Sequence, residues 1–371
     1  MTLCLTKKVQ DMFQVKGLKS VETPTIDTWH VTIDTINRKK MLVFCHVETG
    51  YTLFLYGLKK SDVKNLNSIF IDVLQESLRF DGFTTTAIDE FVLRLGDFSF
   101  GKTSNKSIIA KTTLRKQSMY SYLEYLDKHK RNQKIINHRV NHLLDRKQND
   151  PHTLMKDLLK QWIPAPVSYT GHEVDVAIEL EEGKILRRLL VPSHYTLNDL
   201  HVVIQKAFGW KNIHLHDFFN DNSSEAYAIP EDLAELNDDY LDSRLLTLDE
   251  AFMNWMEWDY NYDFGDDWTH HIFCRMTHHS PHKIIPKCIS FEGDNIPEDV
   301  GGILGYENFL TICNNPDHPE HESMKQWIQL IDHHSFDLEL LNNSLKYNIP
   351  IELHYHLLFN PSILDLLKRK S

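Results

Sequence analysis

The segment 258–274 limits what this chain can fold into more than any other, because apolar and polar residues alternate on both sides of a glycine. The inward-facing residues of its two runs are Trp258, Tyr260, Tyr262 and Phe264, followed by Trp268, His270, Ile272 and Cys274. A period of two places such side chains on one face of a β-strand. A glycine between two such runs is typical of a hairpin turn. The segment therefore predicts an antiparallel hairpin with an aromatic face, closed by a tight turn at Gly265-Asp266.

A second hairpin and a helix precede this segment. Val174–Leu180 alternates between apolar and polar residues, and after a glycine-containing turn Ile185–Val191 is expected to return as a second strand that ends at Pro192. Thr196 and Asp199 have the spacing of a capping box, and the apolar residues that follow are three or four apart up to Gly209. A hairpin followed by a packed helix is typical of a β-grasp-like start. We therefore predict a C-terminal α+β domain over residues 165–349, with a tail over 350–371.

The first 95 residues predict a smaller α+β module. Runs of β-branched and aromatic residues with the length of strands are Trp29–Asp34, Met41–Val47 and Tyr51–Tyr56. Apolar residues three and four apart then predict a helix that begins at Ser61-Asp62, and a second short helix is expected over Thr86–Leu95. Residues 96–164 are expected to form a mostly helical connector, with helical patterns over Ser118–Gln148 and Thr153–Trp162.

The charge of the chain is divided unevenly. The formal net charge is −12, but residues 1–150 carry +8 and residues 151–371 carry −20. The positive excess lies in residues 101–150, which hold 12 basic and 4 acidic residues. Such a stretch predicts contact with nucleic acid, docking on the acidic neighbouring domain, or a solvated helical face. The residues expected to contact nucleic acid are Lys128, Lys130 and Arg131.

Several classes of protein are excluded by composition. The chain has no run of 18 apolar residues, so no membrane-spanning helix and no membrane partner are expected. The N-terminus lacks the basic, apolar and small regions of a signal peptide. Its five cysteines are scattered and form no CxxC pair, which fits reduced thiols. We therefore expect a cytoplasmic protein.

One group of histidines and acidic residues falls at predicted strand ends and turns, where functional sites commonly lie. Together, imidazole and carboxylate groups can hold a divalent metal ion or transfer protons. A structural role is the alternative for these residues. An aspartate in a turn can hydrogen-bond its own backbone, and His270 shares a strand face with core residues. The candidate ligand or metal cluster comprises His214, His216, Asp263, Asp266, Asp267, His270, Glu298 and Asp299, with Asp217 beside it.

Two further patterns point less directly to chemistry. Thiols and imidazoles suit zinc, but their spacing lacks the paired CxxC or HxxxH arrangement of a closed tetrahedral site; these residues are Cys274, His278, His279, His282 and Cys288. The segment Pro297–Gly302 has a glycine pair that could cradle an anion before a helix. Its Glu298 and Asp299 would repel a phosphate, so a structural loop closing over the hairpin is expected there instead.

Six spaced motifs resemble the plasmid pRiA4b ORF-three-like family over about 168–345. They are Ile185–Pro192, Leu197–His201 with Ala207–Trp210, His214–His216, Tyr262–His270, Pro297–Gly302 with Gly305-Tyr306, and Asp317–His321. The sequence departs from the family at Ile296, where a second proline is usual. Residues 1–95 resemble a separate uncharacterised module through Cys4–Lys8, Trp29, Ile36–Lys40 and Tyr51–Leu58. Neither resemblance brings an established activity, so neither implies a catalytic residue.

The function expected from these patterns is that of a binding or interaction module, with a protein partner possible and the ligand unknown. A specific fold without a recognisable catalytic set supports this interpretation. One alternative is a mobile-element or defence accessory that binds nucleic acid through the basic residues of 101–150. The other is a metal-dependent hydrolase that uses the Asp and His cluster, with a divalent metal as its cofactor.

Overall fold

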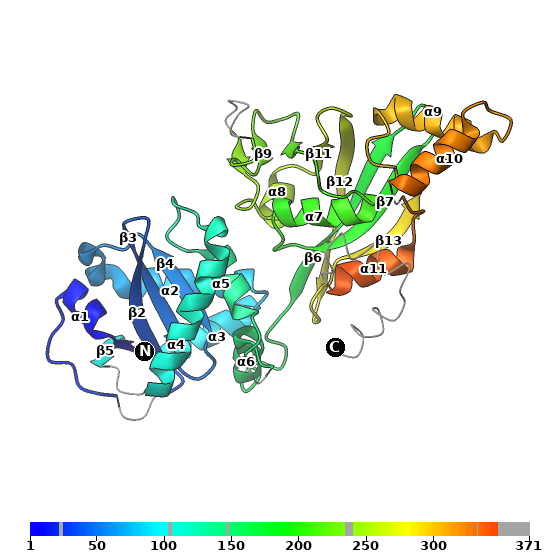
Figure 1. Ribbon diagram of the computed structural model, residues 1–371. Helices are drawn as coiled ribbons and strands as arrows, with labels where there is room; N and C mark the ends of the chain where they lie inside the picture. The colour runs from blue at the N-terminus through cyan, green and yellow to red at the C-terminus, as the bar shows by residue number, and fades with distance from the viewer. Residues whose placement is uncertain (22–24, 103–105, 146–147, 234–239, 332, 348–371) are drawn as a thin grey trace. The chain divides into compact units, whose positions relative to one another are not determined.

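The chain folds into two units of α+β structure, Met1–Tyr169 and Thr170–Ser371. In this computed structural model, the described residues are 1–21, 25–102, 106–145, 148–233, 240–331 and 333–347 (Figure 1). Each unit is built on one mixed β-sheet that is covered by helices. The predicted α+β class is therefore confirmed, and each unit is described separately below.

The N-terminal sheet has five strands in the order β4-β3-β2-β1-β5. Its strands are β1 (Thr2–Leu5), β2 (Thr28–Ile36), β3 (Lys39–His46), β4 (Thr52–Tyr56) and β5 (Ser99–Lys102). The three predicted strands form the antiparallel part, β2 to β4, whereas β1 pairs in parallel with both β2 and β5. The short strands β1 and β5 were not predicted, because four residues are too few to show a period of two.

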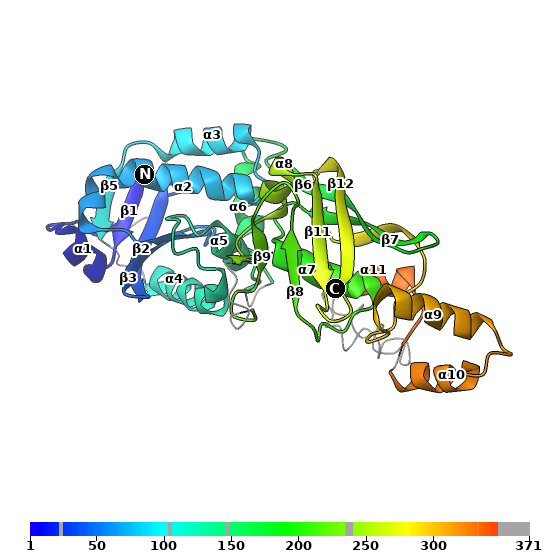
Figure 2. The same cartoon turned by 90° about the horizontal axis from the view of Figure 1, so that it is seen from above.

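Helices cover both faces of this sheet. They are α1 (Lys7–Phe13), η1 (Lys60–Asn65), α2 (Leu66–Phe80), α3 (Thr85–Leu95), α4 (Lys106–Met119), η2 (Tyr120–Tyr125), α5 (Lys134–Asn141) and α6 (Pro151–Leu159). Figure 2 shows α2 and α3 on one face and α4 on the other. The predicted helix over Ser118–Gln148 is wrong as one element, because the chain leaves helical conformation between η2 and α5. There Asp127 accepts hydrogen bonds from the backbone N–H groups of His129 and Lys130, which stabilises a turn instead.

Helix α5 closes the open edge of the sheet with side-chain amides. The Oδ1 atom of Asn137 accepts from Phe54 N, and the Asn141 amide bonds both N and O of Thr52, each at 2.8–2.9 Å. These contacts satisfy backbone groups of β4 that no further strand pairs, which is how an edge is protected from pairing with another chain. The segment 96–164, expected to be a connector, thus contributes helices that complete the N-terminal unit.

The C-terminal sheet has eight strands in the order β10-β9-β8-β11-β12-β6-β7-β13. Its strands are β6 (Tyr169–Glu179), β7 (Lys184–Pro192), β8 (His216–Phe219), β9 (Ala226–Ala228), β10 (Leu241–Asp242), β11 (Glu257–Tyr262), β12 (Trp268–Ser280) and β13 (Lys287–Glu292). Both predicted hairpins are present, as β6–β7 and β11–β12. Because β8 lies beside β11, the residues that precede β8 come close to the turn that follows β11.

The helices of this unit are α7 (Leu197–Phe208), α8 (Leu248–Asn254), α9 (Gly302–Asn314), α10 (His321–Leu330) and α11 (Leu338–Tyr347). The capping box predicted at the start of α7 is formed by Thr196 with Asp199, and α8 begins with a second capping box, formed by Thr247 with Glu250. Helix α7 ends as predicted at Gly209, whose φ is 78°. Helix α10 begins after its N-cap residue Glu320.

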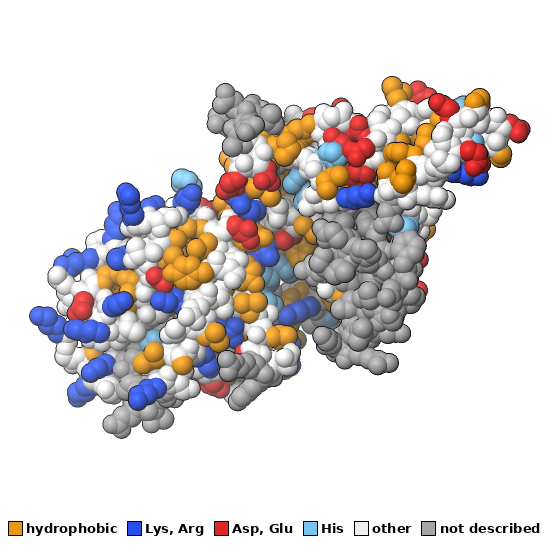
Figure 3. Space-filling view, in the orientation of Figure 1, with side chains coloured by type: hydrophobic (Ala, Val, Ile, Leu, Met, Phe, Trp, Pro, Cys, Tyr) orange, Lys and Arg blue, Asp and Glu red, His pale blue; other side chains and the backbone are white. Residues whose placement is uncertain are grey.

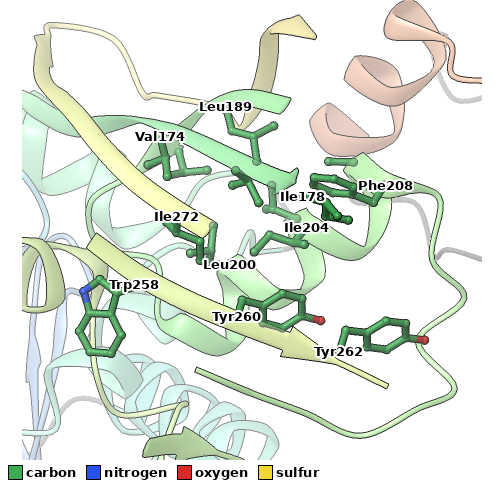
Figure 4. Packing of buried hydrophobic residues seen from close by; sticks show 14 of the residues in the cluster. Val174, Ile178, Leu189, Leu200, Ile204, Phe208, Trp258, Tyr260, Tyr262 and Ile272 are labelled. Atoms are coloured by element: carbon green, nitrogen blue, oxygen red, sulfur yellow. The ribbon is translucent and has the colours of Figure 1, made fainter. Parts of the chain in front are cut away.

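The core of the C-terminal unit lies between α7 and the inner face of the sheet. Figure 4 shows side chains from β6, β7, α7, β11 and β12 meeting there. The predicted aromatic face is confirmed for Tyr260, Tyr262 and Trp268, which are fully buried. Phe264 is the exception, because it lies in the turn after β11 and is 37% exposed.

The hairpin turn is longer than the predicted pair Gly265-Asp266. Residues 263–267 connect β11 to β12, and the left-handed positions are Asp263 (φ 59°) and Asp267 (φ 56°) rather than the glycine. The Oδ1 atom of Asp263 accepts from the backbone N–H of Gly265 at 3.0 Å, and Asp267 N donates to Asp263 O at 2.7 Å. Aspartate tolerates the left-handed region and bonds its own backbone in turns, so two aspartates replace the tight glycine turn.

Candidate functional site

The ring of His214 is surrounded by carboxylates. Its Nε2 atom lies 3.0 Å from Asp299 Oδ1, 3.5 Å from Asp263 Oδ2 and 3.8 Å from Glu298 Oε1. One potential ligand atom from each of His214, Asp263 and Asp299 falls within 4.8 Å of the other two. The structure therefore brings together four of the eight residues of the predicted cluster.

Hydrogen bonds from Tyr262 and Lys211 fix this arrangement. Tyr262 lies at the end of β11, and its hydroxyl donates to Glu298 Oε1 at 2.7 Å and accepts from Ile213 N at 3.1 Å. Lys211 N donates to the other oxygen, Glu298 Oε2, at 3.1 Å. A buried tyrosine thus ties the segment before β8 to the loop before α9. Burial raises the pKa of Glu298, and the Tyr262 and Lys211 hydrogen bonds oppose that rise.

The loop before α9 is held against the hairpin turn by close backbone contacts. Gly301 N donates to Asp266 Oδ2 at 2.9 Å. A Cβ atom on Gly302 would lie 2.6 Å from the Asp266 carbonyl oxygen, so only glycine fits at this position. This outcome matches the expected structural loop, and it brings Asp299, itself left-handed at φ 56°, beside His214. Asp266 makes this contact with the glycines, whereas Asp267 lies in the turn between β11 and β12.

A pocket of about 570 Å³ adjoins the carboxylate cluster and shares His214 with it. The pocket opens beside α7 and the segment before β8. Its walls combine imidazole, amide and aliphatic groups, as ligand pockets commonly do. The lining residues are Asn198, His201, Val202, Asn212, Ile213, His214, Leu215, His216, Ile229 and Asp232.

The ring of His216 lines this pocket and lacks a hydrogen bond. It is 7% exposed and stacks on His201, with ring centroids 3.6 Å apart. Within the described part of the chain, its buried Nε2 atom has no hydrogen-bond partner. Burial lowers the pKa of His216 to about 4, so the ring is neutral near pH 7. An unpaired buried polar atom at a pocket wall is costly unless a ligand or water reaches it.

Burial holds the pKa of the neighbouring His201 well below its ordinary value, and a chain of hydrogen bonds fixes the orientation of its ring. The Tyr260 hydroxyl donates to His201 Nδ1 and His201 Nε2 donates to Asn212 Oδ1, both at 2.8 Å. The Tyr260 hydroxyl in turn accepts from Gln205 at 2.8 Å. Sequence reasoning did not select His201, Asn212 or the Tyr262 hydroxyl. A histidine on the apolar face of a predicted helix was the available signal for His201.

His270 does not belong to the site. It is fully buried, its Nε2 atom accepts from Trp210 Nε1 at 3.1 Å, and its Nδ1 atom donates to Trp268 O at 2.8 Å. Burial lowers the pKa of His270 to about 3. Both ring nitrogens are used inside the core, which is the structural alternative noted for this residue. Asp217 lies on β8, and burial together with Asp267 raises its pKa to about 6.

The residues of the zinc pattern are used separately. Cys274 and Cys288 are buried free thiols, and the pKa of each is raised to about 11 by burial. His278 Nε2 pairs with Glu173 at 3.1 Å, and His279 Nδ1 lies 3.3 Å from the Thr170 hydroxyl. Within the described ranges, no metal-ligating group of three or more includes these residues.

The predicted nucleic-acid contacts lie in the turn between η2 and α5. Lys128, Lys130 and Arg131 are exposed, with Lys130 3.9 Å from Asp127 and Arg131 3.8 Å from Asp62. Figure 3 shows Lys and Arg side chains spread over the visible face of the N-terminal unit. Other basic residues of 101–150 serve packing: Arg115 is buried and Arg139 stacks on the Tyr125 ring at 3.9 Å. Nucleic-acid binding therefore stays a prediction that rests on three exposed side chains.

Across the part of the chain that the structure describes, no helix is both long and apolar enough to span a membrane.

Comparison with known proteins divides the chain as the structure does. The family model described as plasmid pRiA4b ORF-3-like protein matches residues 170–343, and one described as domain of unknown function (DUF6933) matches residues 2–153. The uncharacterized protein y4hQ of Sinorhizobium fredii (strain NBRC 101917 / NGR234) is 32% identical over 162 residues, which are 43% of this chain and 81% of that protein.

A crystal structure of a protein of unknown function, MM3350 from Methanosarcina mazei Go1, is also similar. It shares 25% sequence identity and a TM-score of 0.40, over 46% of this chain and 97% of that chain. The two family models confirm the resemblance seen in the six motifs and the separate N-terminal domain. Through its C-terminal domain, the chain belongs to the plasmid pRiA4b ORF-3-like protein family.

Proposed function

We propose that the C-terminal domain is a binding module that holds a divalent cation at His214, Asp263 and Asp299 and receives a small ligand in the adjoining pocket. One observation carries this proposal: the imidazole that three carboxylates surround, at 3.0–3.8 Å, is also a wall of the pocket. A ligand in the pocket would therefore lie next to the bound ion.

The charge of the cluster supports a cation. Three carboxylates converge on a single imidazole, and like charges brought this close repel one another unless a positive ion lies between them. Glu298 is 5% exposed and receives hydrogen bonds from Tyr262 and Lys211, so its carboxylate is fixed beside the three proposed ligands and adds to the negative charge there. A mixed imidazole and carboxylate set suits Zn²⁺ or Mn²⁺ better than Mg²⁺, which prefers oxygen ligands.

Metal-dependent hydrolysis is the second candidate. The observation that favours it is the small number of protein ligands, because three ligands leave coordination positions open for a water molecule. Binding requires only the cluster and the pocket, whereas hydrolysis also requires a proton acceptor beside the attacking water. We therefore favour the binding role.

The test is a thermal-shift and calorimetric titration of the full chain, freed of metal by chelation, with Mn²⁺, Zn²⁺ and Mg²⁺. Binding at 100 times the Kd is expected to stabilise the C-terminal domain by about 2.7 kcal/mol. Asp263→Asn and His214→Ala should each weaken the binding at least tenfold, by the loss of one ligand.

His271→Ala is the matched control for this titration. His271 Nδ1 lies 2.6 Å from Asp259 Oδ1, so it is a histidine–carboxylate pair of the same domain outside the metal-ligating group of three. Its variant should keep the affinity of the unmodified chain. The proposal fails if no ion binds, or if His214→Ala and Asp263→Asn bind as tightly as His271→Ala.

A further inference from the structure

A second group of histidines surrounds a buried carboxylate in the N-terminal unit. Asp81 ends α2, and its side chain is 1% exposed. One of its oxygens lies 2.6 Å from His138 Nδ1 on α5, and the other accepts a hydrogen bond from the buried Tyr51 hydroxyl at 2.5 Å. The side chain of Asp81 is therefore fixed from two sides, in front of two histidines of one helix turn.

His142 supplies the third member of the group. It follows His138 by one helical turn, and the two rings lie 4.1 Å apart between centroids. The Nδ1 atom of His142 donates to the His138 carbonyl oxygen at 2.8 Å, which fixes the tautomer and leaves the lone pair on Nε2. Among the residues that the structure describes, His142 Nε2 has no hydrogen-bond partner. A metal-binding histidine is commonly held in this way, with its other ring nitrogen donating to a carbonyl or carboxylate.

We propose that Asp81, His138 and His142 bind a divalent transition-metal ion. One potential ligand atom from each residue lies within 4.8 Å of the other two. Two ligands at bonding distance from a tetrahedral zinc ion are about 3.3 Å apart, so the 2.6 Å contact between His138 Nδ1 and Asp81 Oδ1 has to open by about 0.7 Å if both atoms are ligands. The site is independent of the cation site proposed for the C-terminal domain, because it uses different residues in a different unit.

The ligand set indicates the class of ion. Two imidazoles and one carboxylate are a set typical of zinc and of other transition metals such as Co²⁺ or Ni²⁺, whereas Mg²⁺ and Ca²⁺ prefer oxygen ligands alone. Three protein ligands leave a position for water. His138 has 15% of its side chain exposed, so the ion can reach the site from the surface.

The surroundings hold the ligands in place. His152 Nε2 donates to the Asp81 carbonyl at 3.0 Å, and its ring stacks on His142 with 4.5 Å between centroids. The alternative is that this is a structural hydrogen-bond network and nothing more. That alternative accounts for Tyr51, Asp81 and His138, but it gives no role to the lone pair on His142 Nε2.

Titration of the metal-free full chain with Co²⁺ tests the proposal, with visible absorption bands and calorimetry as the measurements. The unmodified chain should show bands of cobalt bound to nitrogen and oxygen ligands. His142→Asn and His138→Asn should each weaken the N-terminal binding at least about tenfold. His142 is only partly buried, so its variant is expected to fold, which circular dichroism checks.

Two control variants separate the possible results. His129→Ala removes an exposed histidine of the same unit and should leave cobalt binding unchanged. His214→Ala should weaken binding only at the C-terminal cluster, so the two proposals fail independently of each other. Two results would show that the group is only a structural hydrogen-bond network. In the first, His142→Asn and His138→Asn bind cobalt as tightly as the unmodified chain and His129→Ala do. In the second, the His214→Ala variant binds no cobalt.

Discussion

The imidazole rings of His201 and His216 stack face to face, with centroids 3.6 Å apart and planes 5° from parallel. Two imidazolium ions cannot occupy such a stack, because their charges would repel at short range inside the protein. Burial, together with the neighbouring His216, holds the pKa of His201 well below its ordinary value. Protonation of these rings should therefore destabilise the wall of the pocket.

Acid should destabilise the C-terminal domain through this pair. The pKa of His216 is about 4 in the folded domain and 6.5 in an unperturbed chain, so between these pH values the unfolded chain binds a proton that the folded domain does not. Stability then falls as the pH is lowered from 6.5 toward 4, by up to about 1.4 kcal/mol per pH unit for this residue. Denaturant unfolding at pH 5, 6 and 7.5 measures this slope.

The variant His216→Phe keeps an aromatic ring and removes the titrating group. Its unfolding free energy should depend less on pH than that of the unmodified chain. The slopes should differ by at most the uptake of one proton, which is about 1.4 kcal/mol per pH unit. The exposed His279 provides the control, since His279→Phe should leave the slope unchanged. An unchanged slope in His216→Phe would contradict the assignment.

Arg187 should contribute more to stability than any exposed arginine. It is fully buried, and its guanidinium donates to the carbonyl oxygens of Leu186, Ala207, Glu292, Gly293 and Asp294 at 2.8–3.1 Å. Its planar group also lies 4.0 Å from the Phe336 ring. Arg187→Leu leaves several buried carbonyls without donors, so a loss of roughly 3 kcal/mol or more is expected in denaturant unfolding.

Arg188→Ala is the natural comparison for Arg187→Leu. Arg188 is the next residue, it is 28% exposed, and it pairs with Asp175 at 2.7 Å. An ion pair of this kind should contribute about 1 kcal/mol or less. Equal losses in the two variants would show that the buried carbonyls find other partners.

Gly302→Ala should loosen the loop that carries Asp299. Its φ is 68° and an added Cβ would lie 2.6 Å from the Asp266 carbonyl oxygen, so both strain and a clash are expected. Together they should cost at least about 2 kcal/mol and weaken cation binding at His214. Gly183→Ala is the control, because its φ is 83° but no atom lies within 4 Å of the added Cβ. It should cost about 1–2 kcal/mol and leave cation binding intact.

The nucleic-acid alternative makes a prediction about salt. If Lys128, Lys130 and Arg131 contact phosphates, replacing all three by alanine should reduce the slope of log K against log salt by about three. Replacing the exposed Lys7, Lys8 and Lys16 should not change that slope. Gel-shift or anisotropy titrations at several salt concentrations measure it. Absent or salt-independent binding by the unmodified chain would remove this alternative.

Much of the local structure could be predicted from periodicity and capping. The alternation around Gly265 predicted which aromatic residues of β11 and β12 are buried, because a strand sends every second side chain to the same face. Thr196 predicted a helix start, because its side chain satisfies a backbone N–H group three residues away. Each of these signals acts within a few residues, which is why one sequence was enough to find them.

The site could be predicted only as a collection of residue types. His214, Asp263 and Glu298 were named, but so was His270, because a histidine on a core face and one at a site look alike in a sequence. Two tertiary contacts decided that His214 meets Asp263 and Glu298 while His270 does not. They are the pairing of β8 with β11 and the contact of Asp266 with the glycines at the start of α9. The sequence by itself determined which residues alternate, cap and turn. Only the tertiary structure decided which carboxylates meet one imidazole, because such contacts join segments as much as 85 residues apart.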